Sequence, residues 1–151
     1  MPRPDEHQFL NKVLQGCAEA VEFCEQLFGI SQVLDDLIDK DKPVPDEAIT
    51  RAFWMALIEL PANPFYRQHE PYLRPLMASA LQDWTDATCM ERAGDDHGKH
   101  LAFVLRDQLT TVVIQCTYLI GGYGWMQEVS EPIRRHFHED LLADYMNDLR
   151  G

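Results

Sequence analysis

Three aspartates in the first third of the chain have the spacing that most directly suggests chemistry. Asp35, Asp36 and Asp39 stand at i, i+1 and i+4, so an α-helix through them places the three carboxylates on one side. Oxygen ligands crowded on one helix face suit a hard divalent cation such as Mg²⁺. An amphipathic helix with a solvated acidic face shows the same pattern, because the opposite side carries the apolar residues Val33, Leu34, Leu37 and Ile38. The two interpretations stay open.

A cation held by one helix face needs carboxylates from a second helix to complete its coordination. Asp83 and Glu91 are eight residues apart and share one stripe of a predicted helix, and Asp107 lies on the next predicted helix. We therefore predict that these three residues complete a Mg²⁺ site begun by the aspartate cluster.

Arg106 and Asp107 are adjacent charges within the most apolar stretch of the chain. If that stretch is a central helix, at least one of them is desolvated and needs a partner. In a structural interpretation, Arg106 makes a bidentate bridge to a carboxylate of another helix. In a functional one, Asp107 is a metal ligand or catalytic base, and Arg106 contacts a phosphate together with Lys99, seven residues earlier.

The remaining polar clusters have simpler interpretations. Asp95 and Asp96 precede His97 and His100, and this group is typical of a charged helix start. A basic patch on the last predicted helix is interpreted as a solvated face, and the three tryptophans as core or interface anchors. The patch consists of Arg134, Arg135, His136 and His138. The tryptophans are Trp54, Trp84 and Trp125.

Helical periodicity dominates the chain, and no alternating strand pattern competes with it. The prediction is an all-α fold with one domain, residues 1–151, and a bundle of about six helices. A central hydrophobic helix is predicted near 97–120. The other five helices are predicted over about 5–28, 31–41, 46–60, 71–92 and 130–149.

Local signals set these predicted boundaries. Gly29 is expected to end the first helix and Ser31 to cap the second, Pro61 to end the third, and the glycines of 121–124 to end the fifth. Residues 62–70 are expected to be an irregular connector. The core-facing side of the third helix is predicted to comprise Ile49, Phe53, Ala56, Leu57 and Leu60.

Composition narrows the functional classes. With 13 basic and 25 acidic residues, the chain has a net charge of −12. This charge argues against nucleic acid or an anionic membrane as the main partner, since both need a basic footprint. The start lacks an apolar signal core, no stretch is long enough to span a membrane, and the four cysteines show no metal or disulfide spacing, so a cytoplasmic location is expected.

Two resemblances accompany these patterns. Residues 35–39 (Asp-Asp-Leu-Ile-Asp) resemble the DDxxD motif of isoprenyl diphosphate synthases, which are all-α enzymes that use it to hold Mg²⁺ against a diphosphate. Residues 35–41, 63–66 and 102–107 together resemble small uncharacterised proteins of tailed bacteriophages. The second resemblance implies a phage origin and the cytoplasm of an infected host cell, and it implies no activity.

The leading hypothesis is a small phage-type helical protein whose Mg²⁺ site binds or hydrolyses a phosphorylated or diphosphate ligand. The alternative is a non-enzymatic helical interaction protein that binds a host or phage protein, with its aspartates solvated and the Arg106–Asp107 pair structural. A homo-oligomer is compatible with both hypotheses.

Overall fold

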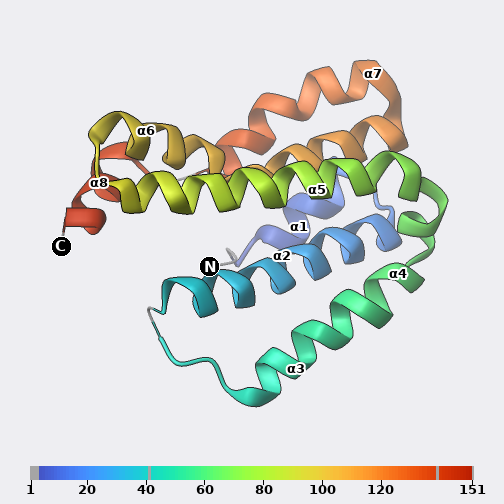
Figure 1. Ribbon diagram of the computed structural model, residues 1–151. Coiled ribbons are helices and arrows are strands. Elements are labelled where there is room, and N and C mark those ends of the chain that lie inside the picture. The colour runs from blue at the N-terminus through green and yellow to red at the C-terminus, as the bar shows by residue number, and fades with distance from the viewer. Residues whose placement is uncertain (1–3, 41, 139, 151) are drawn as a thin grey trace. The chain divides into compact units, whose positions relative to one another are not determined.

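The computed structural model describes residues 4–40, 42–138 and 140–150, and every regular element in them is helical (Figure 1). The predicted all-α fold is confirmed. Within these ranges no helix is long and apolar enough to cross a membrane. The elements in chain order are α1 (Glu6–Val13), α2 (Ala18–Asp39), α3 (Asp46–Trp54), the π-helix η1 (Met55–Glu59), α4 (Leu60–Ala62), α5 (Pro64–Ala93), α6 (Asp96–Leu105), α7 (Leu109–Phe137) and α8 (Leu142–Arg150).

The chain divides into two compact units, Met1–Glu70 and Pro71–Gly151, whose boundary falls within α5. We call them unit 1 and unit 2. Each has its own buried apolar side chains. In unit 1 the fully buried ones include Leu10, Leu14, Phe23 and Cys24, and in unit 2 they include Leu73, Val112, Val113, Cys116 and Ile133. The single domain over residues 1–151 stays a prediction.

Unit 1 begins with a helix break at a different place from the one predicted. Gln15 and Gly16 have φ values of 54° and 75°, and this left-handed pair ends the first helix after Val13. In contrast, α2 runs without interruption through Gly29 and Ser31, and the Ser31 hydroxyl donates to the Leu27 carbonyl at 2.8 Å. The prediction that these two residues separate helices was therefore wrong, because tertiary packing overrides weak local signals.

The third predicted helix is interrupted by a π turn. The backbone N–H of Leu60 donates to the carbonyl of Met55, five residues earlier. Pro61 follows, and its ring would clash with the carbonyl four residues before it in a regular α-helix. A wider π turn relieves this crowding. The helix therefore continues past Pro61, which was predicted to end it, and stops at Asn63.

Asn63 begins α5, so the predicted irregular connector over 62–70 was also wrong. Its side-chain oxygen accepts a hydrogen bond from the Tyr66 backbone N–H at 3.0 Å, and its amide nitrogen donates to the Glu19 carbonyl at 2.9 Å. Pro64 takes the first helical position, where no N–H is needed. The helix then includes both Pro75 and Pro71, and a helix start was predicted at Pro71.

Unit 2 divides the predicted central helix 97–120 into two. Asp95 caps α6 by accepting a hydrogen bond from the Gly98 N–H at 2.9 Å, as one of the two predicted caps. That helix ends at Leu105, and the turn 106–108 places Arg106 and Asp107 between two helices instead of within one. Six residues within 110–117 are buried, so the second of the two helices carries most of the burial that was expected of the single predicted helix.

A reversal at Gly122 shapes the rest of unit 2. Gly122 has φ 83° and ψ −177°, which breaks the helical geometry of α7 and folds its two halves into a hairpin (Figure 1). The predicted break in the glycine-rich segment 121–124 is confirmed. The second half of the hairpin passes through residue 130, where the last predicted helix was expected to begin, and ends at Phe137.

Candidate functional site

The three aspartates of the DDxxD-like segment lie at the end of α2 in unit 1. Each is partly buried, whereas Leu37 and Ile38 expose 37% and 36% of their surface. Asp36 accepts a hydrogen bond from the Gln32 amide at 3.1 Å and lies 3.8 Å from the Lys42 ammonium. Asp41, which contributes to the phage resemblance, lies outside the described residues.

The predicted completing ligands lie in unit 2. Asp83 and Glu91 are on α5, and Lys99, the predicted phosphate contact, is on α6. Glu91 forms an ion pair with Arg106, and Asp107 forms one with His138. Across residues 4–40, 42–138 and 140–150, no group of three or more His, Cys, Asp or Glu side chains is arranged to hold a metal ion. Mg²⁺ binding stays a prediction, and a thermal-shift titration with MgCl₂ would measure it.

Arg106 has the partner that the structural interpretation requires. Its Nη1 donates to the Glu91 carboxylate, and only 20% and 14% of the two side chains are exposed. The guanidinium carbon also lies 5.8 Å from the centre of the Trp84 ring, within the range of a cation–π contact. Arg106 thus ties the turn after α6 to α5.

Asp107 meets His138 because the α7 hairpin brings its two ends together. A straight helix of 29 residues would be about 43 Å long, yet the His138 Nδ1 lies 3.1 Å from the Asp107 carboxylate. The side chains are 26% and 30% exposed, so the interpretation of His138 as part of a solvated face was wrong. Arg134 and Arg135 of the same patch are exposed, as predicted.

Burial raises the pKa of the Asp107 carboxyl above its ordinary value. The charge of His138, hydrogen bonds from Thr110 and His138, and the charge of Arg134 act in the opposite direction and offset part of this rise. A carboxylate that orients an imidazole is one component of a general acid–base site.

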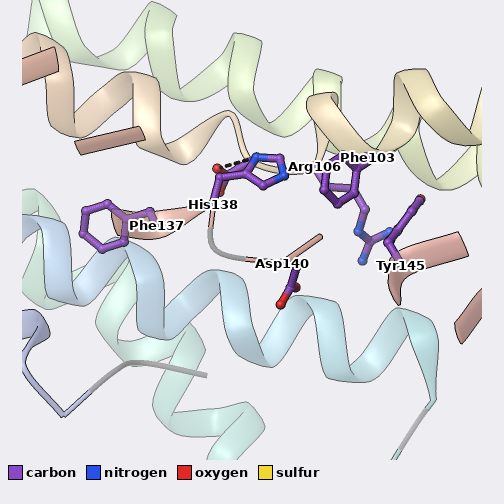
Figure 2. A pocket seen from close by; sticks show the side chains of 7 residues that line it. Phe103, Arg106, Phe137, His138, Asp140 and Tyr145 are labelled. Carbon is purple, nitrogen blue, oxygen red and sulfur yellow. Dashed lines mark ion pairs between the residues drawn. The ribbon is translucent and has the colours of Figure 1, made fainter. Parts of the chain in front are cut away.

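A pocket of about 190 Å³ lies beside this pair (Figure 2). The side chains of Arg106 and Tyr145 approach each other there. The centre of the Phe103 ring lies 4.4 Å from the centre of the His138 ring and 5.1 Å from that of the Tyr145 ring. The lining residues are Phe103, Arg106, Asp107, Phe137, His138, Asp140 and Tyr145. They include no serine, threonine or cysteine that could act as a nucleophile, and among their charged groups Arg106 pairs with Glu91 and Asp107 pairs with His138. This cluster therefore has a structural role, because it holds the turn 106–108 against α5 and the end of α7.

A second candidate site is an apolar surface on unit 1, formed by four large side chains of α3 and η1. We call it the α3–η1 surface. The exposed fractions are 63% for Phe53, 55% for Trp54, 68% for Leu57 and 49% for Ile58. The prediction that Phe53 and Leu57 face the core was therefore wrong, whereas Leu60 is buried at 4%.

The inward side of the same segment is made of smaller or more flexible residues. Ala52, Met55 and Ala56 are partly buried, and the segment packs on α2. Gly29 of α2 faces Met55, since a Cβ atom there would lie 3.8 Å from the Met55 sulfur. This contact turns the neighbouring pairs 53–54 and 57–58 away from α2. The sequence carries a signal for such a surface, because residues 52–58 are apolar on every side of a helix.

One ion pair borders the α3–η1 surface. The Arg51 guanidinium donates to both carboxylate oxygens of Glu59, eight residues later, and the longer of the two hydrogen bonds is 3.4 Å. The two side chains are 55% and 32% exposed. The surface therefore has an apolar centre and a polar edge, which is the anatomy of a protein–protein interface.

Comparison with known proteins gives no assignment. No protein-family model matches the chain, and neither curated proteins nor solved structures show a significant match to it.

Proposed function

We propose that this chain is a non-enzymatic interaction protein that binds a protein partner through the α3–η1 surface. The observation that carries the proposal is the exposure of four large apolar side chains, two of them aromatic, on one short segment. Tryptophan is among the residues that dominate the energetics of protein interfaces, and contiguous exposed apolar patches mark such sites.

The polar residues of unit 2 support this choice over catalysis. Arg106 and Asp107, which were predicted as phosphate contact and catalytic base, each have a protein partner that restrains a helix end. Glu91 compensates the charge of Arg106, and His138 contacts the carboxylate of Asp107. A structural role accounts for both residues without a substrate.

Site-specific photo-crosslinking tests the proposal. A benzophenone amino acid replaces Leu57, whose exposure of 68% makes the replacement compatible with folding, and the protein is irradiated in the cells that produce it. We expect a cross-linked product of one defined mass, because a specific partner presents the same surface to Leu57 in every complex. Peptide mapping then identifies the partner and the contacted residue.

The control places the same photo-crosslinker at Leu81, an exposed leucine of unit 2 with 54% exposure. We expect no defined product from this position. A second control combines the Leu57 photo-crosslinker with Trp54→Asp, which should remove the product. If positions 57 and 81 give the same diffuse adducts, the interaction function is contradicted.

A further inference from the structure

The α3–η1 surface is complementary to itself. Its aromatic residues, Phe53 and Trp54, lie in its N-terminal half, and its aliphatic residues, Leu57 and Ile58, lie in its C-terminal half. The midpoint between the two pairs falls between Met55 and Ala56. A two-fold axis through this midpoint would pack the segment antiparallel to its copy, with each aromatic side chain opposite an aliphatic one.

The polar edge has the same symmetry. Arg51 and Glu59 lie on either side of the midpoint at nearly equal separation. In the antiparallel arrangement, Arg51 of one copy lies beside Glu59 of the other, with an offset of about one residue, or roughly 1.5 Å along the helix. Two such contacts, related by the two-fold axis, therefore bring opposite charges together across the interface. A second copy thus satisfies both the apolar centre and the charged edges.

We propose that the partner of the α3–η1 surface is a second copy of this chain, bound as an antiparallel two-fold dimer. This inference rests on the proposed interaction function and names its partner. The four apolar side chains expose on the order of 400 Å², about half of what one partner contributes to a standard interface. The dimer is consequently a weak one, with a Kd on the order of micromolar.

Sedimentation equilibrium of the purified full chain measures this association. Between about 0.1 µM and about 50 µM, which brackets a micromolar Kd, the average mass rises from near that of one 17.5 kDa chain toward twice that value. Leu57→Glu weakens the association by about tenfold or more, because it places a charge in the apolar centre. Leu81→Glu, on another exposed leucine that lies in unit 2, leaves it unchanged.

A charge-exchange experiment identifies the antiparallel arrangement. Arg51→Glu and Glu59→Arg each break the ion pair within a chain and place like charges together in a homodimer, so each variant associates several-fold more weakly than the unaltered chain. In an equimolar mixture of the two variants, opposite charges meet again across the interface, while the pairs within each chain stay broken. We expect the mixture to associate more tightly than either variant alone.

Three results would overturn the dimer. The chain could stay monomeric over the whole concentration range, Leu57→Glu could leave its association unchanged, or the mixture could associate no better than its components. The first result combined with a photo-crosslinked product from Leu57 to a different protein would reject the second copy and retain the interaction function. A monomeric chain that also gives no defined photo-crosslinked product from position 57 would reject both the dimer and the interaction function.

Discussion

At the scale of single residues, charged side chains of unit 2 form ion pairs that connect helix ends. Arg106 connects the turn 106–108 to Glu91 on α5, and Asp107 connects the same turn to His138 at the end of α7. Both pairs are less than one third exposed, so they are screened less by water than surface pairs are. The turn is thereby held from two sides.

Glu91→Gln should destabilise the protein, because it removes the charged partner of a mostly buried guanidinium. We expect a loss of about 1–3 kcal/mol in the free energy of unfolding. Urea titration followed by circular dichroism measures it. Glu131→Gln is the matched control, since the Glu131–Arg135 pair is 75% and 80% exposed, and it should change stability by less than about 0.5 kcal/mol. Equal effects of the two substitutions would contradict a fastening role for Arg106.

Asp107 should make stability depend on pH in a defined direction. Because burial raises its pKa in the folded protein, the folded state holds this proton more tightly than the unfolded chain does. The free energy of unfolding contributed by Asp107 therefore falls as the pH rises from its ordinary pKa, about 4, through the raised value. This contribution is fully favourable only below that window.

Asp107→Asn imitates the protonated carboxyl, so we expect the variant to be more stable than the unaltered protein at pH 7. The difference should shrink as the pH falls toward and below about 4, because the carboxyl becomes protonated first in the folded and then in the unfolded state. Urea unfolding at several pH values measures this trend. A variant that is less stable by the same amount at every pH would show that the hydrogen bond to His138 outweighs the burial of the charge.

At the scale of helices, glycine and proline chemistry decides several boundaries. The Asp95 cap, the glycine-rich reversal at 121–124 and the break between the predicted helices 31–41 and 46–60 were predictable. Each depends on backbone preferences of adjacent residues. Asn63 and Pro64 form an equally local helix start that the sequence interpretation overlooked. Gly29 and Ser31 gave a false boundary, because both lie within α2, which is stabilised by packing against α3 and η1.

Gly122 should be the residue on which the α7 hairpin depends most. Its φ of 83° and ψ of −177° form a backbone conformation that is strained for any residue with a side chain. Gly122→Ala should therefore lower the free energy of unfolding by about 1–3 kcal/mol. Gly124→Ala is the control, because a Cβ atom there meets nothing within 4 Å, and alanine should gain up to about 1 kcal/mol in the helix. Thermal unfolding compares them, and an equal response at the two positions would contradict the strained reversal.

At the scale of the whole molecule, a strongly acidic chain carries a local apolar surface. The net charge of −12 favours solubility and opposes close approach of two chains, so association needs a short-range attraction. The α3–η1 surface supplies that attraction, and the Arg51–Glu59 pair at its edge adds no net charge. Self-association at one defined surface is compatible with a highly charged chain under these conditions.

Thermal stability should consequently depend on protein concentration. A dimer that dissociates on unfolding is stabilised by mass action, and we expect Tm to rise by a few degrees between about 5 µM and about 500 µM. Differential scanning calorimetry at the two concentrations measures the shift. Leu57→Glu should abolish it, and a concentration-independent Tm for the unaltered chain would argue against dimerisation.

The sequence by itself determined that the chain is helical and where several helices stop, because periodicity and backbone preference are properties of neighbouring residues. Only the tertiary structure decided which side of residues 52–60 faces outward and that Asp107 meets a histidine 31 positions away. An apolar segment that could bury any of its sides is oriented by the helix it packs on, here through Met55 and Gly29. Likewise, charges far apart in sequence become partners only when a reversal such as Gly122 brings the two ends of a hairpin together.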